Sequence, residues 1–241
     1  MKVLAIDTST VIAAVALMDD EKLLGEYSIN NKKTHSQKLM VMINEIMGNL
    51  DLKPSDIDVF AASIGPGSFT GLRIGVTTVK AMAYATNKPV VGVPTLDALA
   101  YNIVTSNFII CPILDARNNQ VFTALYESNG RKLDRITDYM GIPVSELMQI
   151  IRQKERQVIF TGDAVDLHRE YFRSELGDNC EFAPLGTRLQ RGASVAELAI
   201  MMAKEGKLTD SFELTPFYLR KSQAERELEK KLCGKGDSNG A

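Results

Sequence analysis

The first third of the chain changes from short apolar runs to a helical period of hydrophobic positions. Apolar runs at residues 2–7, 11–17 and 22–29, separated by turn-forming residues, predict three strands of an antiparallel meander. Residues 34–50 then carry apolar side chains at helical spacing, which predicts an amphipathic helix. Its apolar stripe is roughly 160° wide, whereas a helix that rests on one sheet needs only about 100°. The extra width indicates a second buried contact.

A second helix is predicted to carry small or apolar side chains on two opposite faces. A strand at residues 57–63 and a glycine-rich loop lead into a helix over residues 72–86. The two faces are Leu72, Val76, Val79 and Ala83 on one side and Ile74, Thr78, Ala81 and Ala85 on the other. A helix that is apolar on both sides lies between two layers, and small side chains let a neighbouring helix approach closely. The second face is therefore expected to meet a neighbour.

The remaining pattern predicts a second α/β block. Further strands are expected at residues 90–93, 108–114, 120–126, 132–139 and 157–160, and further helices at 94–101, 143–151, 163–172 and 193–205. This order resembles the ribonuclease-H-like fold shared by actin, Hsp70 and sugar kinases. The expected fold class is therefore α/β, with two lobes and mixed sheets. One lobe is expected at residues 1–105 plus 192–230, with a returning C-terminal helix, the other at 106–191, and a disordered tail at 231–241.

Composition and charge limit the classes of ligand and the compartment that fit this chain. The 241 residues are 45% hydrophobic and 24% charged, with a formal net charge of -2, so no overall positive field indicates nucleic acid as the main direct ligand. Three cysteines lie singly along the chain, which fits a reduced, cytoplasmic compartment. Asp7 interrupts the apolar N-terminus, which argues against a signal peptide, and no apolar run is long enough to span a membrane.

The turn after the first strand contains the first candidates for chemistry. Asp7, Thr8, Ser9 and Thr10 could place a carboxylate and hydroxyls near nucleotide phosphates and their metal ion, or they could simply close a hairpin. A nucleotide site of this kind needs a second phosphate loop, but the turn at residues 115–119, DARNN, contains no glycine. The four residues are therefore weak, vestigial candidates, and nucleotide binding by this chain alone is disfavoured.

The segment SIGPGSFTGLRIG, residues 63–75, allows two interpretations. Its glycines could present backbone amides to an anion at the start of the following helix, or they could allow a tight turn and close packing of that helix. The lysine of a P-loop is missing, and Arg73 is the only cation in the segment. The structural interpretation is therefore favoured.

Familiar catalytic templates do not match the sequence. A metal-binding histidine pair on the first helix would need a second ligand one turn after His35, but that position is Leu39. The other histidine, His168, is far away in the sequence. The chain contains no GxSxG motif, and none of its cysteines has a histidine nearby in sequence. No catalytic residue and no metal site are expected.

Six segments together resemble the bacterial TsaB (YeaZ) family. They are MKVLAIDTST, THSQKL, SIGPGSFTGLRIG, PTLDALA, ILDARNNQVFTALY and PFYLRKSQAERE, and they occur in the family's order over essentially residues 1–230. GPGSFTGLRIG is the most specific of them. The resemblance implies the actin-like (ASKHA) fold and a subunit that works with its homologue TsaD and with the ATPase TsaE. That complex transfers threonylcarbamoyl from threonylcarbamoyl-adenylate to the adenosine next to the anticodon of tRNA.

The resemblance also implies that this subunit is a non-catalytic scaffold. TsaD carries a metal-binding histidine pair on its first helix, whereas the matching segment here holds His35 alone. ATP or ADP and the metal are expected to belong to partner subunits, tRNA to be contacted indirectly, and the chain to form a homodimer when TsaD is absent. The residues expected at the partner interface are His35, Leu39, Met40, Met42, Ile43, Ile46, Met47, Arg73, Ile74, Thr78, Ala81 and Ala85.

Several alternatives stay open. The methionines of the first helix could fill the chain's own core instead of meeting a partner. The chain could also be an actin-like kinase or ATPase that acts alone, or a metallopeptidase-like hydrolase with a metal near His35. If the interface is correct, a glutamate at Met47 or Ala81 is expected to weaken TsaD binding more than it lowers the melting temperature.

Overall fold

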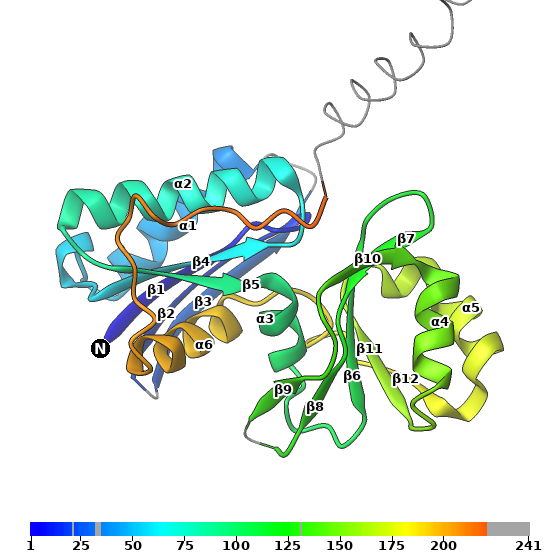
Figure 1. Cartoon of the computed structure of the whole chain (residues 1–241). Coiled ribbons are helices and arrows are strands. Elements are labelled where there is room, and N and C mark those ends of the chain that lie inside the picture. Colours follow the sequence, from blue (N-terminus) through cyan, green and yellow to red (C-terminus); the bar gives the residue numbers. More distant parts are fainter. Residues whose placement is uncertain (21, 32–34, 131, 221–241) are drawn as a thin grey trace, which may run out of the picture.

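The computed structural model describes residues 1–20, 22–31, 35–130 and 132–220, which form two β-sheets flanked by helices (Figure 1). The first sheet has the strand order β3-β2-β1-β4-β5. Its strands are β1 (Lys2–Asp7), β2 (Ile12–Asp19), β3 (Lys22–Asn30), β4 (Val59–Gly65) and β5 (Val90–Pro94). β1, β2 and β3 pair antiparallel, which confirms the predicted meander, while β4 and β5 add in parallel.

Helices cover both faces of this sheet because its central strand is apolar on both sides. Leu4 and Ile6 of β1 face one way and Val3 and Ala5 the other, as alternation along a strand requires. On the first face lie α1 (His35–Asn49) and α2 (Phe69–Thr86), and on the second lies α6 (Gly192–Lys204) (Figure 1). A short 3-10 turn, η1 (Pro54–Asp56), follows α1. The C-terminal part of the described chain therefore returns to the first sheet.

The second sheet is also mixed. Its main path is β10-β7-β6-β11-β12, with β8 pairing to β6 and β9. The strands are β6 (Ile109–Asp115), β7 (Gln120–Thr123), β8 (Tyr126–Ser128), β9 (Leu133–Arg135), β10 (Met140–Pro143), β11 (Val158–Thr161) and β12 (Cys180–Phe182). The accompanying helices are α4 (Val144–Arg152) and α5 (Val165–Leu176), with η2 (Gly177–Asn179) after α5, and α3 (Thr95–Tyr101) follows the first sheet. The α/β class with mixed sheets is confirmed, while the exact lobe boundaries stay a prediction.

Three local predictions need correction. The second helix begins at Phe69 because the Ser68 side chain caps it by accepting a hydrogen bond from the Gly71 amide at 3.2 Å. The expected strand at 132–139 is limited to β9, which pairs with β8, and the next strand, β10, begins at Met140 and pairs with β7. β12 was not predicted. The expected strand at 120–126 is likewise divided into β7 and β8; between them, Leu125 accepts from the Ile136 amide and donates to the Thr137 hydroxyl. The expected tail at 231–241 lies outside the described residues.

Candidate partner-binding site

A groove of about 850 Å³ runs between α1 and α2 on the outer surface of the first sheet's helical layer. The residues that give it its apolar character are Met40, Phe69, Ile74, Ala81, Met82 and Ala85. Met40 is 53% exposed, and Ala81 and Ala85 are also exposed. Apolar side chains that line an open groove favour a protein partner over free solvent.

Most of the apolar stripe on α1 is used within the chain. Leu39, Met42, Ile43, Ile46 and Met47 are all at most 5% exposed and pack in one core cluster with the sheet. The partly buried side chain of Leu52 and the buried Ile57, in the connection after α1, belong to the same cluster. These five side chains are therefore buried within the chain and offer a partner little exposed surface, and their place at the interface stays a prediction. Leu39 still borders the groove, and Met40 is open to it.

The second face of α2 lines the groove as the sequence pattern indicated. Ile74 and Thr78 are half-buried, and Ala81 and Ala85 are exposed, whereas the opposite face is buried in the core. The hydroxyl of Thr78 donates to the Ile74 carbonyl at 2.8 Å. Because that hydrogen bond satisfies the hydroxyl donor inside the helix, Thr78 can be buried in an interface without a hydrogen-bond acceptor from the partner.

Arg73 and His35 occupy different settings. The Arg73 guanidinium lies 3.9 Å from the centre of the Phe69 ring, and its Nε donates to the Tyr218 hydroxyl at 3.1 Å. Tyr218 stacks on Phe69 with 4.5 Å between the ring centres. Arg73 therefore lies at the groove within an aromatic cluster. His35 instead donates from Nε2 to the Thr10 carbonyl at 2.7 Å, which ties the start of α1 to the first turn.

The first turn is closed by its own hydrogen bonds. The buried Asp7 carboxylate accepts from the Ser9 amide at 2.8 Å, the Ser9 hydroxyl at 2.6 Å and the Ser63 hydroxyl at 2.6 Å. Burial raises the pKa of the Asp7 carboxyl, and the hydrogen bonds from Ser63 and Ser9 offset part of that rise. Thr8 donates to the Gly71 carbonyl at 2.7 Å, and Thr10 donates to Gln190 at 3.0 Å.

The glycine-rich loop brings α2 against this turn. A side-chain carbon at Gly67 would collide with the Ser9 carbonyl, and one at Gly71 would collide with the Thr8 carbonyl. The Ser68 amide also donates to the Ser9 carbonyl at 2.6 Å. The loop therefore uses its glycines for close backbone approach, which is the structural interpretation favoured by the sequence.

Phe69 and Met82 are among the groove residues that sequence reasoning did not name. Phe69 was placed in the loop, although the Ser68 cap could have indicated that the helix starts one turn earlier. Met82 lies at the border between the two faces of α2, so the helical period alone assigned it to neither. Over the described ranges of the chain, no group of three His, Cys, Asp or Glu side chains is arranged to hold a metal ion. None of the described helices has the length and apolar character needed to cross a membrane.

Comparisons with known proteins agree with one another. Residues 22–228 match the family model described as "TsaD: tRNA N6-adenosine threonylcarbamoyltransferase". A relative from Bacillus subtilis, named tRNA threonylcarbamoyladenosine biosynthesis protein TsaB, is 33% identical over 93% of this chain and 96% of its own length. The Escherichia coli protein of the same name is 33% identical over 53% of this chain and 55% of its own length.

Solved structures show the fold. A crystal structure from Pseudomonas aeruginosa, described as similar to peptidase YeaZ, has a TM-score of 0.77 and 22% identity over 91% of this chain and 99% of that one. Component A of (R)-2-hydroxyglutaryl-CoA dehydratase from Acidaminococcus fermentans has a TM-score of 0.51 and 12% identity over 85% of this chain and 99% of that one. The fold is thus the actin-like α/β fold expected from the order of elements. With a full-length relative and a family model over most of its residues, the chain belongs to the TsaB (YeaZ) family.

Proposed function

We propose that this chain is a non-catalytic scaffold subunit in the biosynthesis of threonylcarbamoyladenosine in tRNA, and that it binds a TsaD homologue through the groove between α1 and α2. The groove is the observation that carries the proposal, because it is open, apolar and formed by two rigid helices. The names of the Bacillus subtilis and Escherichia coli relatives support the pathway.

The groove suits a helix of a related subunit. The small residues Ala81 and Ala85 allow close approach of helix backbones, and Met40 and Met82 can repack around different neighbours. An interface built on such a helix pair is expected to bury about 1,200–2,000 Å² in total. The same surface would serve a second copy of this chain when TsaD is absent, so homodimer and heterodimer would compete.

The first turn supports a non-catalytic role. The Asp7 carboxylate and the hydroxyls of Thr8, Ser9 and Thr10 all have partners within the chain. A phosphate group or its cation could use these atoms only after those hydrogen bonds were broken. In this proposal ATP or ADP and the metal bind to partner subunits. TsaE binds to the complex that this chain forms with TsaD, and the chain contacts tRNA only indirectly, in the cytoplasm.

The mass of the assembled protein tests this proposal directly. The chain alone has a mass of 26.5 kDa, so light scattering should give about twice that value for a twofold-symmetric homodimer. Addition of its TsaD homologue should replace that species by a one-to-one heterodimer. If the chain elutes as the same species before and after TsaD is added, and no joint species forms, the proposed function is wrong.

A further inference from the structure

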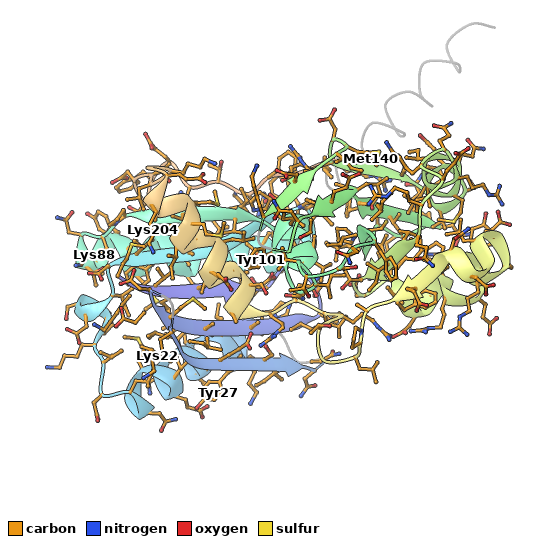
Figure 2. All side chains as sticks on the ribbon, turned by 90° about the horizontal axis from the view of Figure 1, so that it is seen from below. Lys22, Tyr27, Lys88, Tyr101, Met140 and Lys204 are labelled. Carbon is orange, nitrogen blue, oxygen red and sulfur yellow. The ribbon has the colours of Figure 1, made fainter. Side chains whose placement is uncertain are left out.

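The groove between α1 and α2 is apolar along most of its length and carries a charge at one end. Arg73 is the single charged side chain among the described residues that line it, and these walls contain no carboxylate. The groove lies on the face of the first sheet opposite α6, which crosses the strands on the side seen in Figure 2. Arg73 lies one turn after Phe69, the first residue of α2, so the charge belongs to the end of the groove where that helix begins.

Both helices of the groove begin at the same edge of the first sheet. β1 and β3 each pair antiparallel with β2, and β4 pairs parallel with β1, so β1, β3 and β4 all run in one direction. α1 follows β3 and α2 follows β4, and both helices therefore start at the edge where β1 ends. Neither helix has an acidic residue in its first turn that would offset the positive end of its dipole. The two helix starts and Arg73 together favour an anionic group of a partner at this end of the groove.

The contacts of Arg73 within the chain position its guanidinium group but do not neutralise it. The guanidinium lies against the Phe69 ring, and its Nε donates to the Tyr218 hydroxyl. Within the described part of the chain, neither terminal nitrogen of Arg73 has a hydrogen-bond acceptor, and the side chain forms no ion pair. Two N–H groups on a planar fork match the two oxygens of a carboxylate. The side chain is exposed in the free chain, and a partner that covered it without supplying a carboxylate would bury an unpaired charge.

We propose that Arg73 selects the partner by forming an ion pair with a carboxylate side chain of the TsaD homologue, next to apolar residues that fill the rest of the groove. This inference rests on the proposed function and specifies the chemistry of the partner. A second copy of this chain fits less well, because two copies that met groove to groove would bring two Arg73 side chains and no carboxylate from either wall. Glu45, the single acidic residue of α1 and α2, lies about 140° around α1 from Met40. Arg73 therefore favours the heterodimer over the homodimer.

Calorimetric titration of the TsaD homologue with the full chain and two variants tests the ion pair. Arg73→Gln removes the charge and should weaken the affinity at least tenfold, whereas Arg73→Lys keeps the charge and should lose less. Raising the salt from about 50 mM to about 500 mM screens an ion pair, so the affinity of the wild type and of Arg73→Lys should fall about threefold or more. The affinity of Arg73→Gln should depend less on salt. Sedimentation of each chain alone should show that Arg73→Gln leaves the homodimer as stable as in the wild type or makes it more stable.

The matched control is Arg173→Gln on α5, where an exposed arginine also lies near an aromatic ring, 5.5 Å from the centre of Phe182. It should change neither the affinity for TsaD nor the homodimer. If the wild type binds TsaD but Arg73→Gln binds within threefold of it, or keeps the full salt dependence, the ion pair is overturned and the proposed function stands. If Arg73→Gln weakens the homodimer as much as the heterodimer, the selection of the partner is overturned. If the wild type does not bind TsaD at all, the inference and the proposed function are both wrong.

Discussion

A negative charge placed at two positions of the helical layer should separate partner binding from folding. Ala81 is exposed on α2 and lines the groove, whereas Met47 on α1 is 5% exposed and belongs to the core. Both positions were expected from the sequence to form the interface. The structure now predicts opposite effects for Ala81→Glu and Met47→Glu.

The expected magnitudes follow from the surroundings of each side chain. In the free chain, Ala81→Glu should change stability by less than about 0.5 kcal/mol, as exposed substitutions usually do. In a complex that fills the groove, the carboxylate would be buried beside the uncharged Thr77 and Ala85, and Arg73 lies about 12 Å away along the helix axis. An unpaired buried charge costs about 3 kcal/mol or more, which would weaken the affinity for TsaD more than about 100-fold.

Met47→Glu should instead act on folding. A carboxylate among Leu39, Ile43 and the sheet would lack a partner, and a loss of about 4 kcal/mol is expected. For a domain of this size that loss corresponds to a fall in melting temperature of about 8–16 °C. Thermal unfolding followed by circular dichroism, together with calorimetric titration of TsaD, measures both effects.

The control is Leu167→Glu, which adds the same charge at a position on α5 that is 64% exposed and far from the groove in sequence and fold. It should alter neither the melting temperature nor the affinity. The reasoning is refuted if Ala81→Glu binds TsaD within threefold of wild type, or if it lowers the melting temperature as much as Met47→Glu does.

Three further measurements follow from the structure. Gly71→Ala should lower the free energy of unfolding by about 1–3 kcal/mol, because its new side-chain carbon would meet the Thr8 carbonyl. Gly48→Ala on α1 has free space around its new carbon and should be neutral or stabilising. Equal effects of the two substitutions in urea unfolding would contradict this. Burial raises the pKa of Asp163 to about 6 from 3.8, so the native state binds that proton more tightly and stability should fall by about 2–3 kcal/mol as the pH rises from 4 to 7. Asp163→Asn should remove that part of the slope, and an unchanged slope would refute it. Calorimetric titration of the chain alone with magnesium and ATP should show no stoichiometric binding, and tight binding would favour the kinase alternative.

The sequence predicted the first sheet and its helices because their periodic patterns are long and are enforced by burial on both faces. The width of the α1 stripe was a less specific signal. It reports how much of the helix is buried, but not what covers it, and here the buried side chains of α1 pack in the core cluster of the chain's own first sheet. Only the contacts of the folded chain distinguish that case from a partner interface.

The turn at residues 115–119 shows a second limit of sequence reasoning. It contains no glycine, yet Arg117, Asn118 and Asn119 have φ values of 65°, 54° and 54°. Asparagine tolerates this region, and the turn is held by hydrogen bonds from Ala116 to Gln120 at 3.0 Å and from α4 to Asn119 at 3.1 Å. The buried position of Gln190 also could not be predicted from the sequence, because its segment has no hydrophobic period and its hydrogen-bond partner Thr10 is remote in sequence.

The first turn and the groove are parts of one arrangement. Thr8 and Ser9 hold the start of α2 through Gly71 and Ser68, and the Thr10 carbonyl holds the start of α1 through His35. A ligand that took the Thr8 hydroxyl would break its hydrogen bond to Gly71 at the start of α2, and the groove beside that helix could then change shape. The residues that look like nucleotide ligands in the sequence therefore tie the N-terminal ends of the two helices to one turn, and changes in that turn should alter partner binding by changing the groove.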